Sequence, residues 1–412
     1  MSPTPVAGLK VLDLSKVLAG PLCAQYLGDM GADVIKIETT GAGDETRGWP
    51  PFRTGTAGES TGTVFLSANR NKRSLAIDLR SEAGRVAVQR LSDQSDVVIE
   101  SFGPGVAKRL GVDAATLRER NPRLVYCSIS GFGSVGPMRD GKGYDVILQA
   151  FCGMLAITGE RGGPPVRSPF SPVDQATGLH ALIGILAALV ERSRTGVGTT
   201  VEASLFDTAT GFLGYFLQGY WERGTEPERP GSGHESLCPY EAFETRDKPL
   251  ILGVANDGLW RLFCDAAGLQ DKVDDPRFAT NAARVANREE TVAMVRGVLV
   301  TRGRNEWMEA LGKVGIPCSP LHTLGELSAH PHTAASGMVY EYPNERLGPT
   351  RAVAQPLRFG GERTSLRRPP PALGEHGREV LRGAGYDDTQ IDAMLSTGVI
   401  ALPSSAGSAS QG

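Results

Sequence analysis

The sequence predicts an α/β protein with a large Rossmann-like domain and a smaller α+β domain. First, the chain opens with a strand at 8–15, a helix at 19–32 and a strand at 33–38, which form a β-α-β unit of the doubly wound type. Second, strands and helices continue to alternate after it. Third, 412 residues are too many for one simple core and predict two domains or one elaborate one.

The remaining elements of the large domain follow in order. Apolar runs predict strands at 73–79, 96–101 and 124–133, with an amphipathic helix at 82–94. A loop rich in Gly and Pro covers 133–145. Helices are expected at 146–158, after Asp174, and over most of 200–224.

The character of the chain changes near Glu222, where Pro, Gly and Ser cluster in a loop. A strand at 249–256 and three amphipathic helices follow. We therefore divide the chain into three segments, the last of which returns to the large domain through a helix at 376–385 and ends in a disordered tail at 404–412. The segments are a large domain at 1–221, a small domain at 222–325 and a return segment at 326–412.

Composition excludes several classes of partner. Hydrophobic residues make up 40% and charged residues 22%, with a net charge of -3, so neither nucleic acid nor an anionic membrane is an expected partner. The six Cys are scattered without metal spacing, which predicts free thiols in a reducing compartment and no metal site. His330 and His332, two residues apart, could belong to a metal site, but further ligands are missing and we read them as a surface loop. The N-terminus lacks a signal pattern, and the apolar run 181–190 is too short to span a bilayer, so a cytoplasmic protein is expected.

Asp174 stands where the polar stretch SPFSPVDQATG gives way to a long apolar helix. Asp is a favoured N-cap residue, so capping alone would explain it. Its position near the positive end of the helix dipole would also keep the carboxylate ionised. Gly178, one turn on, would leave room beside it. An ionised carboxylate with space in front of it can act as a nucleophile, and the residues alone leave both readings open.

Other candidates lie in loops. Lys142, Tyr144 and Asp145 stand in GKGYD, where Lys142 could bind a phosphate and Tyr144 could position a hydroxyl. The alternative is a mobile loop with Asp145 capping its own helix. Arg47 and Trp49 could recognise a small anion, or Trp49 could fasten its loop to the core.

Weaker candidates have an ordinary structural explanation. Lys72 with Arg73, and Lys108 with Arg109, are basic pairs that could hold phosphates, although a solvated basic face is the default. Glu38 ends a strand and could hold a ribose, but we expect it to face water. His234 lies in a Gly-rich loop, mobile or merely exposed. The sequence has no G-x-S-x-G, H-E-x-x-H, Walker A or G-x-G-x-x-G motif, so it does not support serine hydrolase, zinc peptidase, nucleotide hydrolase or dinucleotide-binding functions.

Taken together, these segments resemble the class III coenzyme A transferases, the family that includes formyl-CoA transferase. The resemblance covers nearly the whole chain, and the order and spacing of the segments carry it. They are GLKVLDLSKVLAGPLCAQYLGDMGADVIKIE, GDETRGW, NKRSLAIDL, ESFGPGVAKRLG, NPRLVYCSISGFG, GKGYD, the D-x-x-x-G of Asp174, DPRFATNAARVANR, GIPCSPLHTLGELSAHP and LGEH.

The resemblance implies that Asp174 is the nucleophile. Its carboxylate would attack an acyl-CoA thioester to give an acyl-aspartyl anhydride and CoA thiolate. The thiolate would then attack the anhydride, leaving an aspartyl-CoA thioester and the free donor acid, and an acceptor carboxylate would reverse these steps.

The resemblance also implies the binding residues and the assembly. The substrates would be acyl-CoA and a small carboxylic acid, with coenzyme A as substrate and no permanently bound cofactor. The acid side of the site would include Arg47, Trp49 and His234, and two chains would interlock as a homodimer. The implied CoA-binding residues are Lys16, Val17, Ile77, Asp78, Leu79, Arg80, Ser101, Phe102, Gly103, Arg109, Lys142, Gly143, Tyr144 and Asp145.

Two departures from formyl-CoA transferase bear on the substrate. Leu18 stands where that enzyme has a glutamine, and GSGHESLCPY replaces its glycine-run loop. Both favour a different acid, such as the dicarboxylates succinate or malate or a branched relative, with Arg47 and Arg167 as candidates for a second carboxylate.

Two alternatives remain at this point. An acyl-CoA racemase of the same superfamily would use paired His and Asp, but Tyr144 occupies the His position, and tyrosine is a poor base near neutral pH. A non-catalytic CoA-binding protein would keep the CoA contacts without turnover, which the presence of Asp174 argues against.

Overall fold

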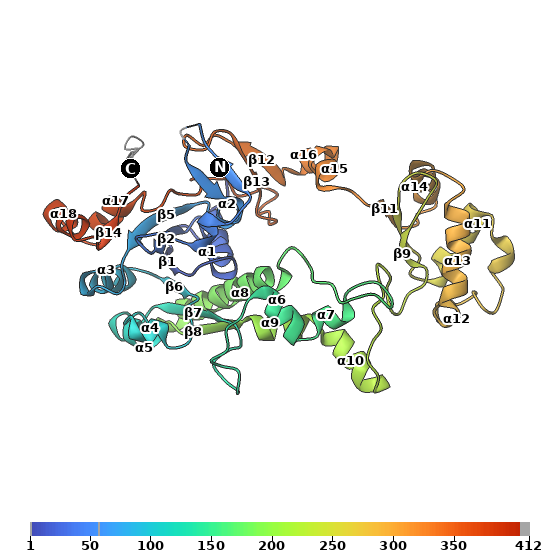
Figure 1. Ribbon diagram of the computed structural model, residues 1–412, viewed down its shortest axis with the longest axis horizontal. Coiled ribbons are helices and arrows are strands. Elements are labelled where there is room, and N and C mark those ends of the chain that lie inside the picture. The colour runs from blue at the N-terminus through green and yellow to red at the C-terminus, as the bar shows by residue number, and fades with distance from the viewer. Residues whose placement is uncertain (1, 57, 404–412) are drawn as a thin grey trace, which may run out of the picture. The chain divides into compact units, whose positions relative to one another are not determined.

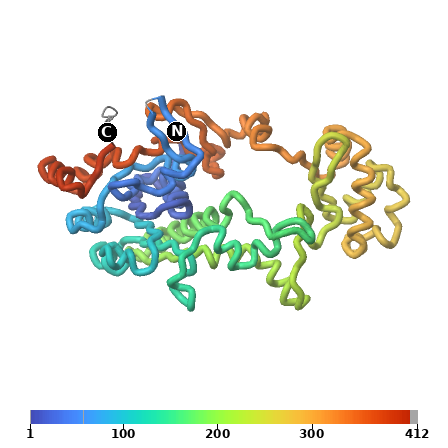
Figure 2. The backbone as a smooth tube through the Cα atoms, viewed as in Figure 1, coloured from blue at the N-terminus to red at the C-terminus, as the bar shows by residue number. Residues whose placement is uncertain are grey.

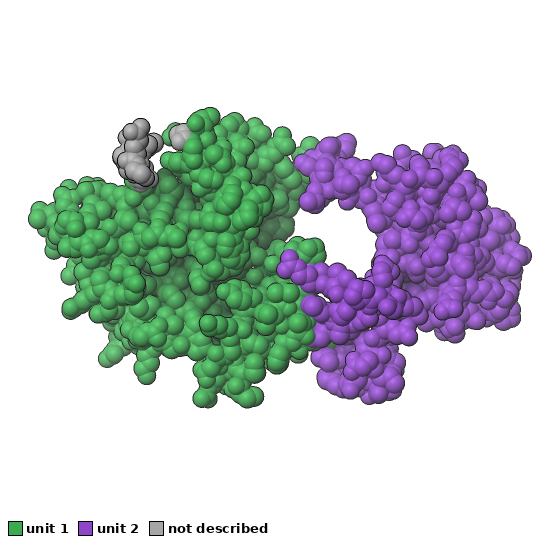
Figure 3. Space-filling view, viewed as in Figure 1, with its two compact units in different colours: residues 1–152, 169–214, 332–412 green, residues 153–168, 215–331 purple. Residues whose placement is uncertain are grey.

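The computed structural model describes residues 2–56 and 58–403, so the tail predicted at 404–412 lies outside the described residues. The chain forms two compact units (Figure 3). Unit 1 comprises residues 1–152, 169–214 and 332–412, and unit 2 comprises 153–168 and 215–331. The chain colours of Figure 2 show that unit 1 contains both the N-terminal and the C-terminal part of the chain. Residues 153–168, which the sequence analysis placed in the large domain, belong to unit 2.

Unit 1 is built on a seven-stranded sheet with the order β14-β5-β2-β1-β6-β7-β8 (Figure 1). All neighbours pair in parallel except the short edge strand β14, which is antiparallel to β5. From β1 the chain builds outward to β2 and β5, and then returns to build β6, β7 and β8 on the other side. The strands are β1 (Lys10–Leu14), β2 (Asp33–Glu38), β5 (Lys72–Ile77), β6 (Val97–Glu100), β7 (Val125–Ser130), β8 (Thr200–Ser204) and β14 (Ile400–Ala401).

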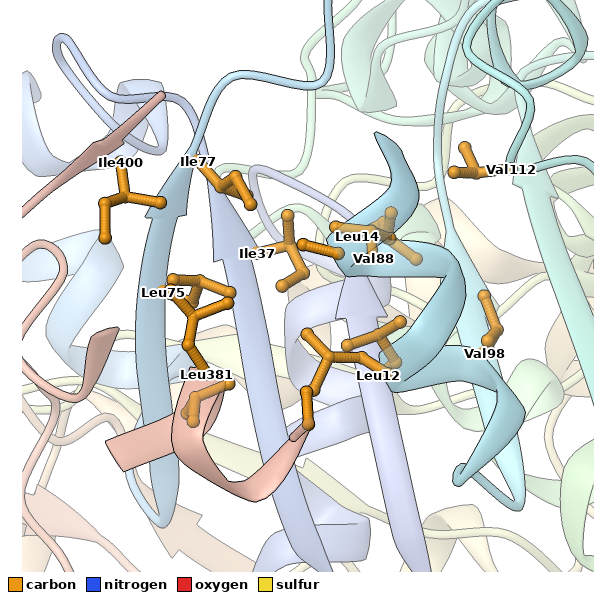
Figure 4. Packing of buried hydrophobic residues seen from close by; sticks show 14 of the residues in the cluster. Leu12, Leu14, Ile37, Leu75, Ile77, Val88, Val98, Val112, Leu381 and Ile400 are labelled. Atoms are coloured by element: carbon orange, nitrogen blue, oxygen red, sulfur yellow. The ribbon is translucent and has the colours of Figure 1, made fainter. Parts of the chain in front are cut away.

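Helices cover both faces of this sheet, as expected for parallel strands that are apolar on both sides. One face packs against α3 (Glu82–Asp93), α5 (Ala114–Arg120), α17 (Gly377–Gly383) and α18 (Asp388–Ser396). Figure 4 shows the resulting core, in which Leu12, Ile37 and Leu75 from three adjacent strands meet Val88 and Leu381. Each such fully buried aliphatic side chain stabilises the fold by roughly 1.5–3 kcal/mol.

The opposite face packs against α1 (Ala19–Asp29) and α8 (Pro172–Thr195), which also lie against each other. The sequence analysis regarded the run 181–190 as too short to cross a bilayer, but that run lies inside a 24-residue helix. By length and composition α8 could cross a membrane, and 39% of its most apolar window is buried inside the protein. Buried core helices of globular proteins pass the same test, so α8 is weak evidence for a membrane span.

Three predicted elements differ from the structure. The segment after Thr199 begins with strand β8 instead of a helix, because TVEAS continues the sheet beside β7. The helix expected at 146–158 is two helices, α6 (Asp145–Phe151) and α7 (Met154–Ile157), separated at Gly153, whose φ of 88° breaks the helix. The C-terminal segment adds β14 to the sheet edge, which the sequence analysis did not predict.

Smaller elements complete unit 1. They are η1 (Glu45–Gly48), β3 (Phe52–Thr54), β4 (Ser60–Gly62), α2 (Thr63–Ala68), α4 (Val106–Arg109), α9 (Leu205–Phe212), β12 (Val339–Tyr342) and β13 (Thr350–Val353). Two helices begin at the borders of the units, α10 (Gly214–Arg223) and α16 (Pro331–Ser336).

Unit 2 has its own core, which contains Trp260, Phe263 and Trp307, all fully buried. Its antiparallel sheet has the order β11-β10-β9, and the sequence analysis had assigned β9 to a loop. Besides α7, its elements are β9 (Tyr240–Phe243), β10 (Leu250–Gly253), β11 (Cys318–Pro320), α11 (Asp257–Ala267), η2 (Gln270–Lys272), α12 (Asn281–Ala286), α13 (Arg288–Leu299), α14 (Arg304–Lys313) and α15 (Leu324–Ala329).

Candidate active site

Unit 1 contains a cavity of about 960 Å³ at the carboxyl ends of β1, β6 and β7. The strand order reverses between β1 and β6, and ligands of open α/β sheets bind at such a point. Five stretches of chain and one helix residue provide most of the lining. They are residues 16–20, 100–105, 128–131, 139–144 and 200–202, together with Asp174.

Asp174 reaches this cavity from the first turn of α8. It is not the N-cap residue, so the capping explanation is wrong. Ser171 is the N-cap, with a left-handed φ of 51°, and Pro172 begins the helix. Among residues 2–56 and 58–403, none hydrogen-bonds to the Asp174 carboxylate. The carboxylate is therefore held in the cavity wall without a structural task.

Asp145 performs the capping instead. Its Oδ2 accepts hydrogen bonds from the backbone N–H groups of Val173, at 2.8 Å, and of Asp174, at 3.1 Å. Gln149 donates to the other carboxylate oxygen. The expectation that Asp145 caps its own helix is wrong, because it lies at the start of α6 and caps α8. This arrangement satisfies the free donors of α8 and leaves the Asp174 side chain unengaged.

Burial and the nearby Asp145 carboxylate raise the pKa of Asp174 to about 7. Desolvation and the like charge of Asp145 therefore oppose the helix dipole, which the sequence analysis expected to keep Asp174 ionised. A carboxyl group with this pKa is partly ionised near neutral pH. It is a stronger base than an ordinary aspartate, which suits a nucleophile.

Gly178 has a different role from the one expected. A Cβ at this position would lie 2.5 Å from the backbone oxygen of Ala19, so the glycine is needed where α8 crosses the start of α1. The close approach leaves no room for a ligand at Gly178. It does bring the loop of Lys16, Val17 and Leu18 to the same cavity as Asp174.

The cavity carries basic side chains suited to an anionic ligand. Lys16 lines it and forms an ion pair of 2.8 Å with Glu45. Arg139 lies 3.5 Å from the neighbouring Asp140, a long contact between exposed groups. Lys108 and Lys142 also line the cavity, and neither forms an ion pair within the described part of the chain.

Glu100 fixes the part of the cavity wall at the end of β6 by accepting hydrogen bonds. It ends β6, lies nearly buried, and accepts hydrogen bonds from the Phe102 N–H, at 2.7 Å, and from the Ser128 hydroxyl. Burial raises the pKa of Glu100. Next to it, the Ser101 hydroxyl accepts a hydrogen bond of 3.0 Å from the Lys16 N–H. The loops after β1 and β6 are thereby joined across the cavity.

Comparison with known proteins identifies the family. Residues 6–377 match the model of CoA-transferase family III. An acyl-CoA transferase from Fusarium pseudograminearum is 40% identical over 96% of this chain and 88% of its own length.

The chain belongs to CoA-transferase family III. The human succinyl-CoA:glutarate CoA-transferase is 34% identical, with 96% of this chain and 90% of that protein covered. Among solved structures, a CAIB/BAIF family protein from Brucella suis superposes with a TM-score of 0.82 at 37% identity, covering 93% of this chain and 100% of that one. The protein is therefore an enzyme of the CoA-transferase type, and such enzymes use CoA thioesters as substrates.

For this CoA-transferase, the structure gathers about half of the predicted CoA-binding residues at the cavity. Asp145 lies behind the cavity wall, where it hydrogen-bonds to the backbone of Val173 and Asp174 at the start of α8. The residues that line the cavity are Lys16, Val17, Ser101, Phe102, Gly103, Lys142, Gly143 and Tyr144.

Besides Asp145, five predicted CoA-binding residues are not part of the cavity lining. Asp78 and Leu79, with Arg80, follow the carboxyl end of β5, where Arg80 is exposed and bonds to Asp78 at 2.9 Å. The Ile77 side chain is buried in the core of the sheet. Arg109 ends the short helix α4. The neighbouring Lys108 lines the cavity instead.

Arg47, a candidate for binding a second carboxylate, is already engaged by other groups of unit 1. Its guanidinium forms a bidentate pair with Glu38, at 2.7 and 2.8 Å, donates to the Pro371 carbonyl, and stacks 3.6 Å from the Phe65 ring centroid. Glu38 is buried and neither faces water nor is free to hold a ribose. Trp49, in the same segment, is partly exposed and does not line the cavity.

Lys72 and Arg73 also form ion pairs with carboxylates of unit 1. Lys72 is completely buried and bonds to Asp13 at 2.8 Å. Arg73 pairs with Asp33 and Glu379. Burial rules out both a phosphate site and a solvated basic face for Lys72, whereas two carboxylates that are themselves exposed pair with Arg73.

His234 and Arg167 lie in unit 2. The Nδ1 atom of His234 accepts a hydrogen bond of 3.1 Å from the Ser236 N–H, and the ring packs edge-to-face on Tyr240. Within the described ranges no group of three or more His, Cys, Asp or Glu could hold a metal ion.

Sequence analysis missed Glu100, Glu45 and Arg139 as lining residues. Glu100 had a usable signal, because it ends an apolar parallel strand at the edge where ligands bind. Glu45 and Arg139 lie in loops whose course no local pattern determines.

Proposed function

We propose that this enzyme transfers CoA from a dicarboxylic acyl-CoA, such as succinyl-CoA, to a carboxylic acid acceptor through an aspartyl-CoA thioester on Asp174. The observation that carries the proposal is the state of Asp174. It lies in the wall of a large cavity, is unengaged by the described residues, and has a pKa near 7. A carboxylate prepared in this way is suited to covalent catalysis.

The reaction would proceed in two halves. A carboxylate oxygen of Asp174 attacks the thioester carbonyl, and the C–S bond breaks to release CoA thiolate and leave a mixed anhydride. The thiolate attacks the aspartyl carbonyl of the anhydride, which frees the donor carboxylate and forms the aspartyl-CoA thioester. An acceptor carboxylate then attacks this thioester, and the returning thiolate completes the new acyl-CoA. No proton is consumed, because carboxylate and thiolate exchange places at each step.

The cavity supports a CoA ligand. Val17, Ser101 to Gly103 and Gly143 to Tyr144 would contact its pantetheine arm. Lys108, Arg139 and Lys142 offer positive charge for its phosphates. Ile77 to Arg80 and Arg109 remain proposals for the nucleotide end of CoA. A Rossmann-like description of unit 1 is supported by its strand order.

Relatives and local chemistry support a dicarboxylic substrate. The printed name of the human relative gives succinyl-CoA as donor and glutarate as acceptor. In this chain, Leu18 lines the cavity where formyl-CoA transferase has a glutamine. Lys16 provides a cation in the same loop, and its pKa is raised by its hydrogen bond with Glu45, which keeps it charged.

A homodimer is supported by an apolar face on unit 1. The helices α6, α8 and α9 contact one another, and each exposes one or more large apolar side chains. Large apolar side chains exposed on neighbouring helices favour an interface there, and we propose a second, interlocked copy as the partner. The exposed residues are Ile147, Phe151, Leu179, Ile183, Val190 and Phe212.

The six cysteines are free thiols, four of them buried, which supports a reducing compartment and a cytoplasmic location. We also propose that the enzyme works without a resident cofactor or a membrane. The chemistry above needs only the two substrates and the Asp174 carboxylate.

Intact mass spectrometry would test the proposal. The enzyme is incubated with succinyl-CoA without acceptor, and the covalent CoA adduct is located by peptide mapping after hydroxylamine or borohydride trapping. An adduct or trapped derivative on Asp174 is expected for wild type and none for D174N. D392N, which changes an exposed surface carboxylate on α18, serves as a control that keeps the adduct.

Two outcomes would contradict the proposal. Tight CoA binding without an adduct from any acyl-CoA donor would favour a non-catalytic CoA-binding protein. Absence of an adduct together with solvent deuterium at the α-carbon of a branched acyl-CoA would favour a racemase.

A further inference from the structure

A cluster of charges lies inside unit 1, between the sheet and the N-terminus of α1. Along β1, β2 and β5 the apolar side chains Leu12, Ile37 and Leu75 point to one face, so the alternate residues point to the other. There the strand register places Asp13 beside Lys36. Both side chains are completely buried.

Asp44 completes the cluster from the loop after β2. It pairs with Lys36 at 3.0 Å, and both side chains are almost wholly buried. Burial raises the pKa of Asp44, but the charge of Lys36 and hydrogen bonds from Thr46 outweigh it and keep the pKa below its ordinary value. Burial lowers the pKa of Lys36, and the charges of Asp13 and Asp44 outweigh it in turn. Both partners are therefore ionised at neutral pH.

These buried charges hold the loop that follows β1. Lys36 Nζ donates to the Ser15 carbonyl at 3.0 Å, and the Val17 N–H lies 3.3 and 3.4 Å from the two Asp44 oxygens. On the other side, Lys72 Nζ donates to the Pro21 carbonyl at 2.8 Å. The residues between these contacts, from Lys16 to Gly20, line the active-site cavity.

Val17 has a conformation that its own side chain disfavours. Its φ is 69°, in the left-handed region, which β-branched residues rarely adopt. A residue of this kind persists only where its surroundings impose the conformation. In the described structure, the polar contacts of the Val17 N–H are to the two carboxylate oxygens of Asp44.

We propose that Asp44, charged and oriented by Lys36, is a positioning residue that holds Val17 in the left-handed conformation and thereby shapes the CoA-binding wall of the cavity. The inference rests on the proposed function for the identity of the ligand. It assigns to Asp44 of the GDETRGW segment a role that neither a surface loop nor a small-anion site explains.

A double-mutant cycle tests this. Glycine adopts the left-handed region without strain, so V17G removes the need for an imposed conformation. We expect D44A to raise the dissociation constant of CoA at least tenfold in the wild-type background, and less than threefold in the V17G background. Calorimetric titration with CoA measures both values without turnover. An equal effect of D44A in the two backgrounds, or none in either, would overturn the inference.

A matched control separates positioning from general stability. Asp29 and Arg70 form another buried ion pair, at 2.6 Å, and neither lines the cavity. D29A is expected to destabilise the protein but to change CoA affinity less than twofold, with or without V17G. A D29A effect on CoA affinity that V17G relieves would also contradict the inference.

The experiment also gives a clear answer if D44A does not fold or if the wild-type protein binds no CoA. If D44A does not fold, D44N keeps the side-chain volume and one acceptor oxygen, and the same dependence on V17G is expected at about a threefold effect. Equal D44N effects in both backgrounds would again overturn the inference. A wild-type protein that binds no CoA would refute the proposed function, whereas CoA binding without the cycle's coupling would refute only the positioning role.

Discussion

At Asp174 the protein tolerates a charge that the fold does not stabilise. The carboxylate is largely buried, near Asp145, and its pKa of about 7 makes its ionisation depend on pH in the physiological range. Since only the ionised form attacks, the rate of adduct formation with succinyl-CoA should rise about tenfold per pH unit below 7 and level off above it. Rapid-quench mass spectrometry from pH 5.5 to 8.5 would measure this profile. A flat profile would show that Asp174 does not titrate there.

The neighbouring carboxylate gives a second prediction. Asp145 raises the pKa of Asp174 through its negative charge, while its oxygen caps α8. D145N removes the charge and retains an oxygen acceptor, so the midpoint of the pH profile should move to lower pH. The same rapid-quench measurement detects the shift. D207N, which changes a carboxylate on α9 away from the cavity lining, should leave the midpoint in place.

The same pKa predicts a cost in stability. Because the folded pKa of Asp174 is raised from 3.8 to about 7, the folded state holds its proton more tightly than the unfolded state. The penalty therefore grows as pH rises from about 4 to 7 and is constant above that. D174N should raise the free energy of unfolding, by about 2 to 3 kcal/mol more at pH 8 than at pH 5. Urea denaturation at the two pH values would measure it, and equal effects would contradict the burial argument.

Among the elements, the crossing of α8 over α1 positions the nucleophile. A Cβ at Gly178 would meet the Ala19 backbone oxygen at 2.5 Å, so G178A must push the two helices apart. We expect a loss of roughly 1–3 kcal/mol in unfolding free energy, together with a drop in kcat, since Asp174 lies one turn away. In contrast, G297A fills open space at an exposed position of helix α13 and should stabilise it by about 0.5–1 kcal/mol. Thermal denaturation and steady-state rates would compare the variants.

Sequence patterns predicted the elements better than their contacts. Apolar runs indicated β1, β2, β5, β6 and β7, because buried parallel strands have an unmistakable composition. Strand β8 was missed because TVEAS is short and is followed at once by a helix.

The candidate site shows the same limit. Asp174 was recognised from its sequence context. Its side chain is not needed to cap α8 because Asp145, which is 29 residues away, caps that helix instead. The Arg47–Glu38 and Lys36–Asp44 pairs also join residues whose proximity only the folded sheet creates. A charge within a predicted parallel strand, such as Lys36 in DVIKIE, was the available signal for a buried network.

At the scale of the whole molecule, unit 1 is assembled from three separate stretches of the chain, with β14 closing one edge of its sheet. The active-site cavity lies at the reversal of strand order, and its lining comes from residues 16 to 205. The C-terminal stretch of unit 1 adds β14 to the edge of the sheet and α17 and α18 to one face, and it contributes no residue to the lining of this cavity.

The exposed apolar face of α6, α8 and α9 predicts the assembly. Ile183 and Val190 are each 63% exposed on α8, and water contact of such side chains is unfavourable at roughly 25 cal/mol per Å². We expect the wild-type protein to be a dimer. The double variant I183E/V190E should give monomers or insoluble protein, because dimerisation would bury two unpaired carboxylates in the interface, which is costly. V86E, on the exposed side of α3, should remain dimeric. Light scattering coupled to size-exclusion chromatography distinguishes these states. A monomeric wild-type protein, or a double variant that stays dimeric, would show that a second copy does not cover this face.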